Sequence, residues 1–213
     1  MAFTPSLLPT LIEAISETIA ENAEHVTALD QAIGDGDHVI NLQRGLAALT
    51  AQSEALAQLD WAAALQKIGM TLMSTVGGAS GSLYGTLFLA MSKACQQQPL
   101  TMSNVGAVFH QGVEAMKQRG KSDVGEKTML DVLIPVATQL QHATQQQMDL
   151  SSILDSLEAV AIAGMESTQP MLATKGRASF LAERSRGWID AGAKTAQLMI
   201  CAITAVLRVQ TAQ

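Results

Sequence analysis

The sequence predicts an all-α protein, because its apolar residues recur at helical spacing and no segment alternates between apolar and polar residues as a strand does. Of the 213 residues, 48% are hydrophobic but only 3% are aromatic, a composition that favours packed helices over a β-sandwich. We therefore expect one domain over residues 1–213, folded as a bundle or closed barrel of eight antiparallel amphipathic helices.

The first four predicted helices fill the N-terminal half of the chain. The first begins near Leu8, with Thr4 or Ser6 available as its N-cap, and the third follows Asp60, which can cap it. The glycine-rich segment 77–82 is expected to be a break between the third and fourth helices. The second, third and fourth helices are expected at about 39–57, 61–76 and 83–97.

Four more helices are predicted in the C-terminal half. The fifth takes Thr101 or Ser103 as its N-cap, and the seventh opens at Asp149 or Ser151. The sixth contains Pro135, which the interior of an α-helix tolerates only with a kink. The fifth is expected to end near residue 120, the sixth to cover about 128–145, the seventh to end near 167, and the eighth near 211.

A long connection separates the last two predicted helices. Residues 170–192 include Pro170, several glycines and most of the basic residues of the C-terminal part of the chain. Ordinary helix–helix connections are much shorter. We therefore expect this segment to be a functional loop that acts as a lid.

The charge of the chain argues against a nucleic-acid partner. Only 15% of the residues are charged and the net charge is -6 at pH 7, whereas neutralising nucleic-acid phosphates requires clustered Lys and Arg. A polyanionic ligand would instead have to be held by a metal ion and by backbone groups.

Neither a membrane nor an oxidising compartment is indicated. The N-terminus lacks the basic region of a signal peptide, and the apolar stretch 191–209 carries Lys194 and Gln197, as a core helix does. Cys95 and Cys201 lie in apolar helical stretches without metal-site spacing, so we expect buried free thiols. These features predict a cytoplasmic protein.

An acidic loop, "DQAIGDGDHVIN" at residues 30–41, predicts a metal site. Asp30, Asp35 and Asp37 surround two glycines that allow the backbone to turn tightly, and such a cluster of like charges calls for a cation. All-oxygen ligands favour a hard ion such as Mg²⁺, Ca²⁺ or Mn²⁺ over zinc. The alternative is that these acids merely cap the following helix and form Asx-turns.

Among hard ions, Mg²⁺ bridging a phosphorylated ligand fits this loop best. An EF-hand starting at Asp30 would need Gly at its sixth position and Glu at its twelfth, where this sequence has Asp35 and Asn41. Mg²⁺ typically takes few carboxylates and completes its octahedron with water and phosphate oxygens. His38 and Asn41 follow the acids closely enough to face the same ligand.

The glycine-rich segment "STVGGASGS" predicts an anion site at the start of the fourth helix. Free backbone N–H groups and the helix dipole favour a phosphate there, and Ser80 and Ser82 add hydroxyl donors. The segment is neither a Walker A loop nor a Rossmann fingerprint, and a tight helix–helix turn is an equally good interpretation. Together with the acidic loop, however, it describes the two halves of a site for a Mg²⁺-bound nucleotide or diphosphate.

Four blocks carry a family resemblance: "LDQAIGDGDHVINLQRG", "GMTLMSTVGGASGSLYGTLF", "RGKSDVGEKTMLDVLIPV" and "KGRASFLAERSRGWIDAGAKT". In this order they resemble the nucleotide-binding L subunits of dihydroxyacetone kinases over nearly the whole chain. That family's fold is a closed barrel of eight amphipathic helices with the nucleotide at one end. Val39 departs from the family pattern, which commonly has glycine there, so the backbone just after His38 is expected to differ.

The resemblance implies a set of site residues. Asp30, Asp35 and Asp37 match the aspartates that hold two Mg²⁺ ions, and together with Arg177, in the lid block, they form the expected catalytic group. The expected nucleotide-binding residues lie close to the phosphates (His38, Asn41, Gly78, Ala79 and Ser80), around adenine and ribose (Gly120, Thr128 and Met129), and in the lid and the element that closes it (Arg177, Asp190 and Gly192).

The resemblance also implies an activity and partners. A free-standing chain of 213 residues looks like the phosphotransferase-system, PEP-dependent type, in which tightly bound ADP serves as a cofactor. A phosphohistidine M subunit recharges it to ATP, and the γ-phosphoryl passes to dihydroxyacetone held on a separate K subunit. A homodimer of this chain is compatible with the sequence.

Other functions stay open on the sequence alone. An isoprenoid-type Mg-diphosphate enzyme would need a second aspartate-rich motif, which is missing. The chain could also be the nucleotide-binding subunit of an ATP-dependent kinase for another short ketose, such as erythrulose. A third alternative is a nucleotide-sensing regulatory subunit without turnover.

Overall fold

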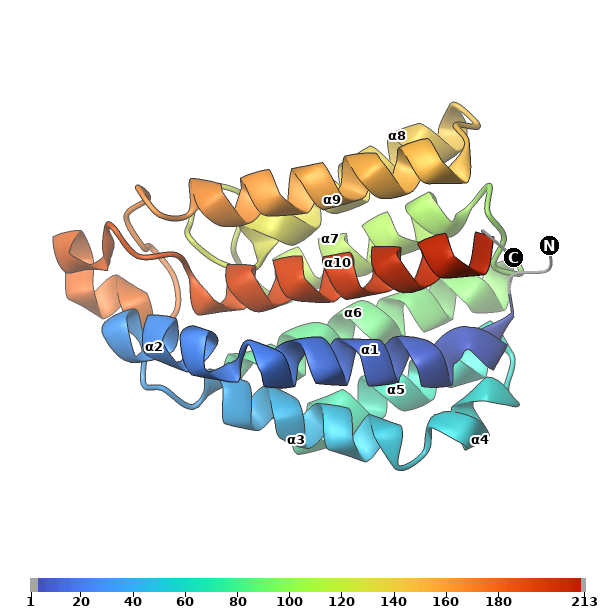
Figure 1. The fold of residues 1–213 in the computed structure, drawn as a ribbon, viewed down its shortest axis with the longest axis horizontal. Coiled ribbons are helices and arrows are strands. Elements are labelled where there is room, and N and C mark those ends of the chain that lie inside the picture. The colour runs from blue at the N-terminus through green and yellow to red at the C-terminus, as the bar shows by residue number, and fades with distance from the viewer. Residues whose placement is uncertain (1–3, 212–213) are drawn as a thin grey trace.

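Long α-helices run side by side through the structure, a computed structural model that describes residues 4–211 (Figure 1). Within this range there is no strand, which confirms the predicted all-α class. Two 3-10 helices accompany the α-helices: η1 (Pro5–Leu7) before the first and η2 (Arg177–Ser185) before the last. The α-helices are α1 (Leu8–Glu21), α2 (Ala23–Ile33), α3 (His38–Thr50), α4 (Ser53–Ala57), α5 (Trp61–Thr75), α6 (Gly78–Gln97), α7 (Val105–Gly120), α8 (Leu130–Gln145), α9 (Leu150–Ser167) and α10 (Ala191–Thr211).

The longer helices follow one another around a closed ring. From α5 to α10 each helix packs against the next one in the sequence, while α10 also packs against α1, α1 against α3, and α3 against α5. The ring thus contains α1, α3 and α5 to α10, in agreement with the expected eight-helix arrangement. Its main buried cluster includes Leu72, Leu87, Val108, Val132 and Leu157, which come from five successive helices of the ring.

Two predicted helices are each divided in the structure. The first breaks at Asn22, which leaves helical geometry (φ -99°, ψ 6°) and separates α1 from α2. The second, predicted over 39–57, ends as α3 at Thr50, and Ser53 begins the short α4. Asn22 has low helix propensity, whereas Ala51 and Gln52, between α3 and α4, are good helix formers, so propensity accounts only for the first break. Within the described residues, α2 and α4 are therefore additional segments beside the eight helices of the ring.

Two of the predicted caps are confirmed. Asp60 Oδ1 accepts from Ala63 N at 2.8 Å at the start of α5, and Asp149 Oδ1 accepts from Ser152 N at 3.0 Å at the start of α9. The predicted cap of the fifth helix is wrong. Asn104 stands at that N-cap, after a turn in which its Oδ1 accepts from Thr101 N.

Helix α10 is long and apolar enough to cross a membrane by length and composition alone, over Ala191–Gln210. In the structure it packs against α1, α8 and α9, as the predicted core helix would. Its Thr195, Gln197 and Thr204 are buried. The two predicted thiols are free, with Cys95 buried and Cys201 only partly so.

Candidate functional site

One cavity of about 480 Å³ contains every site residue that the sequence predicted. Its walls come from α2, α3, α6, the α7–α8 connection, η2 and α10, at the end of the bundle where α2 and η2 meet (Figure 1). Segments more than 150 residues apart in the sequence thus face one ligand-sized space. The predicted residues that line it are Asp30, Asp35, Asp37, His38, Asn41, Gly78, Ala79, Ser80, Gly120, Thr128, Met129, Arg177, Asp190 and Gly192.

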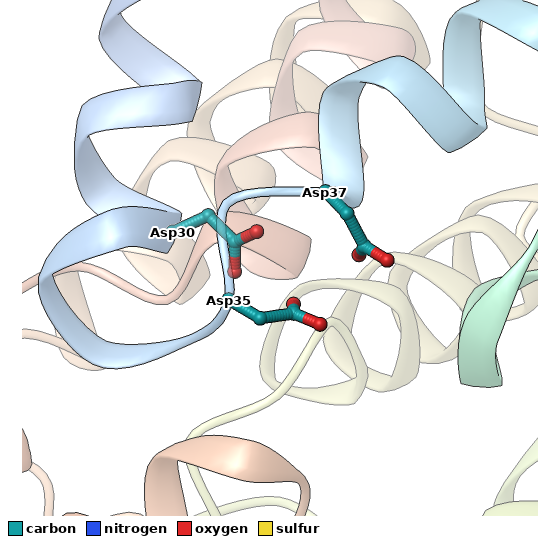
Figure 2. Close-up of side chains that lie close together, drawn as sticks. All are labelled: Asp30, Asp35 and Asp37. Carbon is teal, nitrogen blue, oxygen red and sulfur yellow. The ribbon is translucent and has the colours of Figure 1, made fainter.

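Three aspartates gather around the turn between α2 and α3 (Figure 2). Asp30 comes from the last turn of α2, Asp35 from the connecting loop, and Asp37 from the residue before α3; a ligand oxygen of each lies within 4.8 Å of the others. The glycines between them are required. A Cβ on Gly34 would lie 2.1 Å from Asp30 Oδ1, and Gly36 has φ +76°.

The donor set of this cluster fits a hard divalent cation. Capping accounts for only one of the three carboxylates, because Asp30 Oδ2 accepts from His38 N at 3.1 Å whereas Asp37, at the N-cap position of α3, makes no side-chain cap bond. Arg177 Nη2 lies 2.9 Å from Asp35 Oδ2, so the segment predicted to be a lid brings a positive charge to the cluster. Three carboxylates from one turn could hold Mg²⁺ with room for other oxygen ligands.

The glycine segment is the first turn of α6, which begins at Gly78 and not near residue 83 as predicted. Gly78 takes φ +65°, and Gly81 packs so closely against the end of α5 that a Cβ would lie 2.0 Å from Val76 O. Gly77, at the N-cap, has no side chain to cap the first turn. The first amides of α6 are therefore left as donors at the cavity wall, where an anion would be stabilised.

His38 lies between the acidic cluster and this helix start. Its Nε2 donates to Thr195 Oγ1 at 2.9 Å, since that hydroxyl donates to Gly192 O, and Ser80 Oγ lies 3.4 Å from its Nδ1. Burial lowers the pKa of His38 below its usual value, although the charge of Asp30 opposes this. The next residue, Val39, is helical and buried, so the first turn of α3 needs no positive φ there.

The residues predicted to face adenine and ribose line the same cavity. Thr128 N donates to Asp131 Oδ2 at 2.7 Å, and Met129 is buried. Asp190 Oδ2 caps α10 by accepting from Ala193 N at 2.7 Å, and burial raises the pKa of Asp190 to about 6. A Cβ on Gly192 would lie 3.0 Å from that carboxylate oxygen.

Sequence reasoning missed Lys127, which lines the same cavity but is only 1% exposed. Its Nζ donates to the main-chain oxygens of Thr168 and Trp188, and burial lowers its pKa. Its φ of +62° is unusual for a residue with a Cβ. A lysine in a polar loop is ordinarily solvated, so no local signal marked it.

These features define an all-α protein in which a cluster of three carboxylates and the N-terminus of a helix line one cavity. The family model of the DAK2 domain matches residues 32–205, and the chain belongs to this family. This confirms the resemblance found in the sequence.

Its relatives include subunits of kinases. The chain is 38% identical to the PEP-dependent dihydroxyacetone kinase, ADP-binding subunit DhaL, of Escherichia coli over 185 residues, 86% of this chain and 88% of that protein. It is 43% identical to the PEP-dependent dihydroxyacetone kinase 1, ADP-binding subunit DhaL, of Listeria innocua over 187 residues, 88% of this chain and 89% of that one.

Solved structures of a longer kinase share the fold. The native dihydroxyacetone kinase of C. freundii superposes with a TM-score of 0.75 at 26% identity, over 96% of this chain and 35% of that chain. The same kinase in complex with AMP-PNP and Mg²⁺ gives a TM-score of 0.72 over 93% of this chain and 33% of that chain. The present chain thus corresponds to about a third of that kinase.

Proposed function

We propose that this chain is the ADP-binding, phosphoryl-transferring subunit of a PEP-dependent dihydroxyacetone kinase. The observation that carries the proposal is the single cavity in which Asp30, Asp35 and Asp37 face the first turn of α6. The names of the relatives from Escherichia coli and Listeria innocua point to the same function.

Different residues of the cavity would bind different parts of the nucleotide. Asp30, Asp35 and Asp37 would hold two Mg²⁺ ions, which when bound neutralise phosphate charge and align the transferred group. The amides of Ala79 and Ser80 are suited to the phosphate oxygens. Thr128 and Met129, which line the same cavity, would receive the ribose and the base.

Arg177 would share the charge that develops during transfer. Its guanidinium is on the lid, 69% exposed, and already reaches Asp35, so it can turn to a phosphate oxygen once a cation occupies the cluster. Lys175 and Gly176 line the cavity beside it. A lid in this position supports retention of ADP as a cofactor.

The partners follow from the same proposal. A phosphohistidine M subunit would recharge the nucleotide, and a K subunit would present dihydroxyacetone, because the chain corresponds to only about a third of the C. freundii kinase. All three would act in the cytoplasm, and a homodimer of this chain is compatible with the proposal.

A second candidate is the nucleotide-binding part of a kinase that exchanges ATP. The human triokinase/FMN cyclase is 33% identical over 199 residues, 93% of this chain and 34% of that protein. Rapid exchange of labelled ATP and turnover with the K subunit alone would favour this candidate over the PEP-dependent one.

Reconstitution tests the proposal directly. Purified chain, K subunit and phosphorylated M subunit are expected to convert dihydroxyacetone to its phosphate without added ATP. Asp35→Asn is expected to abolish the conversion while leaving the helical circular dichroism spectrum unchanged, because its neutral amide loses the charge that a cation needs. No conversion by the unaltered chain, or full activity of Asp35→Asn, would contradict the proposal.

A further inference from the structure

Arg44 does not line the cavity, but it forms hydrogen bonds to two residues close to the glycine-rich segment. Its Nη2 donates to Asn41 Oδ1 at 2.9 Å, and its Nη1 donates to the main-chain oxygen of Thr75 at 3.4 Å. Asn41 lines the cavity from the first turn of α3, whereas Thr75 is the last residue of α5. The guanidinium therefore joins α3 to the point at which α5 leads into the glycine segment.

This contact fixes the orientation of the Asn41 amide. A guanidinium has only donors, so the oxygen of the amide must face it and Nδ2 must turn away. Asn41 is 7% exposed, and no protein acceptor contacts its Nδ2 within residues 4–211. A cavity-lining N–H₂ group without a protein acceptor is a donor available to a ligand oxygen.

The amide also lies directly against the glycine segment. A Cβ on Gly77 would lie 2.8 Å from Asn41 Oδ1 and 3.2 Å from Nδ2, so only glycine allows this approach. Gly77 is the N-cap of α6, where the first free amides of that helix begin. The donor of Asn41 and the amides of α6 thus stand side by side.

We propose that Arg44 is a positioning residue for phosphate binding, which holds the Asn41 amide with its N–H₂ group toward the phosphate and keeps the glycine segment beside it. The inference rests on the proposed function, because it requires a phosphate-bearing ligand in this cavity. Without Arg44 the amide can rotate and present its oxygen to the anion, which repels it.

A double-mutant cycle on Mg-ADP affinity, measured by calorimetric titration, tests this role. Arg44→Met is expected to weaken binding about tenfold or more, as loss of a hydrogen bond to a charged group does. In the Asn41→Ala background the same substitution is expected to change affinity by less than about twofold, because the group that Arg44 positions is absent. The nuclear magnetic resonance signals of the Asn41 side-chain amide should shift on Mg-ADP addition in the unaltered protein and not in Arg44→Met.

Lys67→Met is the charge control, because Lys67 is an exposed cation of α5 outside the cavity; its affinity is expected to match that of the unaltered protein. An equal loss from Arg44→Met in both backgrounds would overturn the inference, since Arg44 would then act only through its charge. Unchanged binding by Arg44→Met would overturn it as well. If the unaltered chain fails to bind Mg-ADP, the proposed function fails and this inference fails with it.

Discussion

The side chain of Asp190 caps the N-terminus of α10. It is partly buried, so water solvates its negative charge poorly. Burial raises its pKa to about 6, and the nearby charges of Asp131 and Asp30 also raise it, whereas Lys127 lowers it. The folded protein therefore holds a proton on Asp190 between about pH 4 and pH 6, where the unfolded chain has lost it. By linkage, the contribution of this group to folding stability is present below pH 4 and is lost as the pH rises to 6.

Asp190→Asn should remove this pH dependence, because asparagine also caps helices but does not titrate. In urea unfolding, we expect the free energy of unfolding of the variant relative to the unaltered protein to rise between pH 4 and pH 6 and to level off above. Asp149→Asn is the matched control at another N-cap. Bonds from Ser152 lower the pKa of Asp149, so the relative stability of that variant should instead fall as the pH rises through the acid range. A flat difference for Asp190→Asn would contradict the pKa assignment.

At the scale of the elements, α9 packs against α8 through a glycine. A Cβ on Gly164 would lie 2.5 Å from the main-chain oxygen of Asp131 and 3.1 Å from Val132 Cα. In an ordinary helix interior, Gly→Ala stabilises by roughly 0.5–1 kcal/mol. Here we expect Gly164→Ala to destabilise by roughly 1–3 kcal/mol in urea unfolding, because backbone atoms cannot yield without separating the helices. A more stable variant would show that the two helices separate readily.

The predicted lid, residues 170–192, is held at its base by Lys127. The Nζ of this residue holds Thr168, just after α9, and Trp188, near the end of the lid, while Asp190 N donates to Thr168 Oγ1 at 3.1 Å. Lys127→Met keeps the length of the side chain but leaves two carbonyl oxygens without their donor. We expect trypsin to cleave after the exposed Arg184 roughly tenfold faster, since the lid then opens more often.

Lys194→Met is the control for the lid experiment. Lys194 is half-buried, and its Nζ donates to Gln197 Oε1 within α10. Cleavage of this variant should therefore keep the rate of the unaltered protein. If Lys127→Met were cleaved no faster than Lys194→Met, Lys127 would not hold the lid in place.

At the scale of the whole molecule, the sequence predicted what depends on local pattern. Helical periodicity gave the all-α class, and Asp60 and Asp149 stand at the caps where short-range rules place them. The acidic loop could be interpreted because its three carboxylates lie within eight residues of one another. The resemblance to the family predicted the other site residues, and all of them line one cavity. Their individual roles remain predictions.

The sequence could not predict features that depend on distant packing. Glycines at 77, 78 and 81 appeared to be a break, yet α6 begins among them. Asn41 and the end of α5 leave no space for a Cβ on Gly77 and Gly81, and Gly78 takes a positive φ. The acceptors of Lys127 lie 41 and 61 residues further along the chain, so its burial leaves no local trace. The break at Asn22 was missed because apolar spacing continues from α1 into α2.

The central claim is that the cavity holds a nucleotide through the acidic cluster beneath the lid. A native mass spectrum of the purified chain and of Asp35→Asn, each incubated with Mg²⁺ and ADP and then freed of excess ligand, tests it most directly. We predict a mass excess equal to ADP plus two Mg²⁺ ions on the unaltered chain and none on Asp35→Asn. An unaltered chain that keeps the mass of the polypeptide alone, or an Asp35→Asn variant that carries the same excess, would contradict the claim.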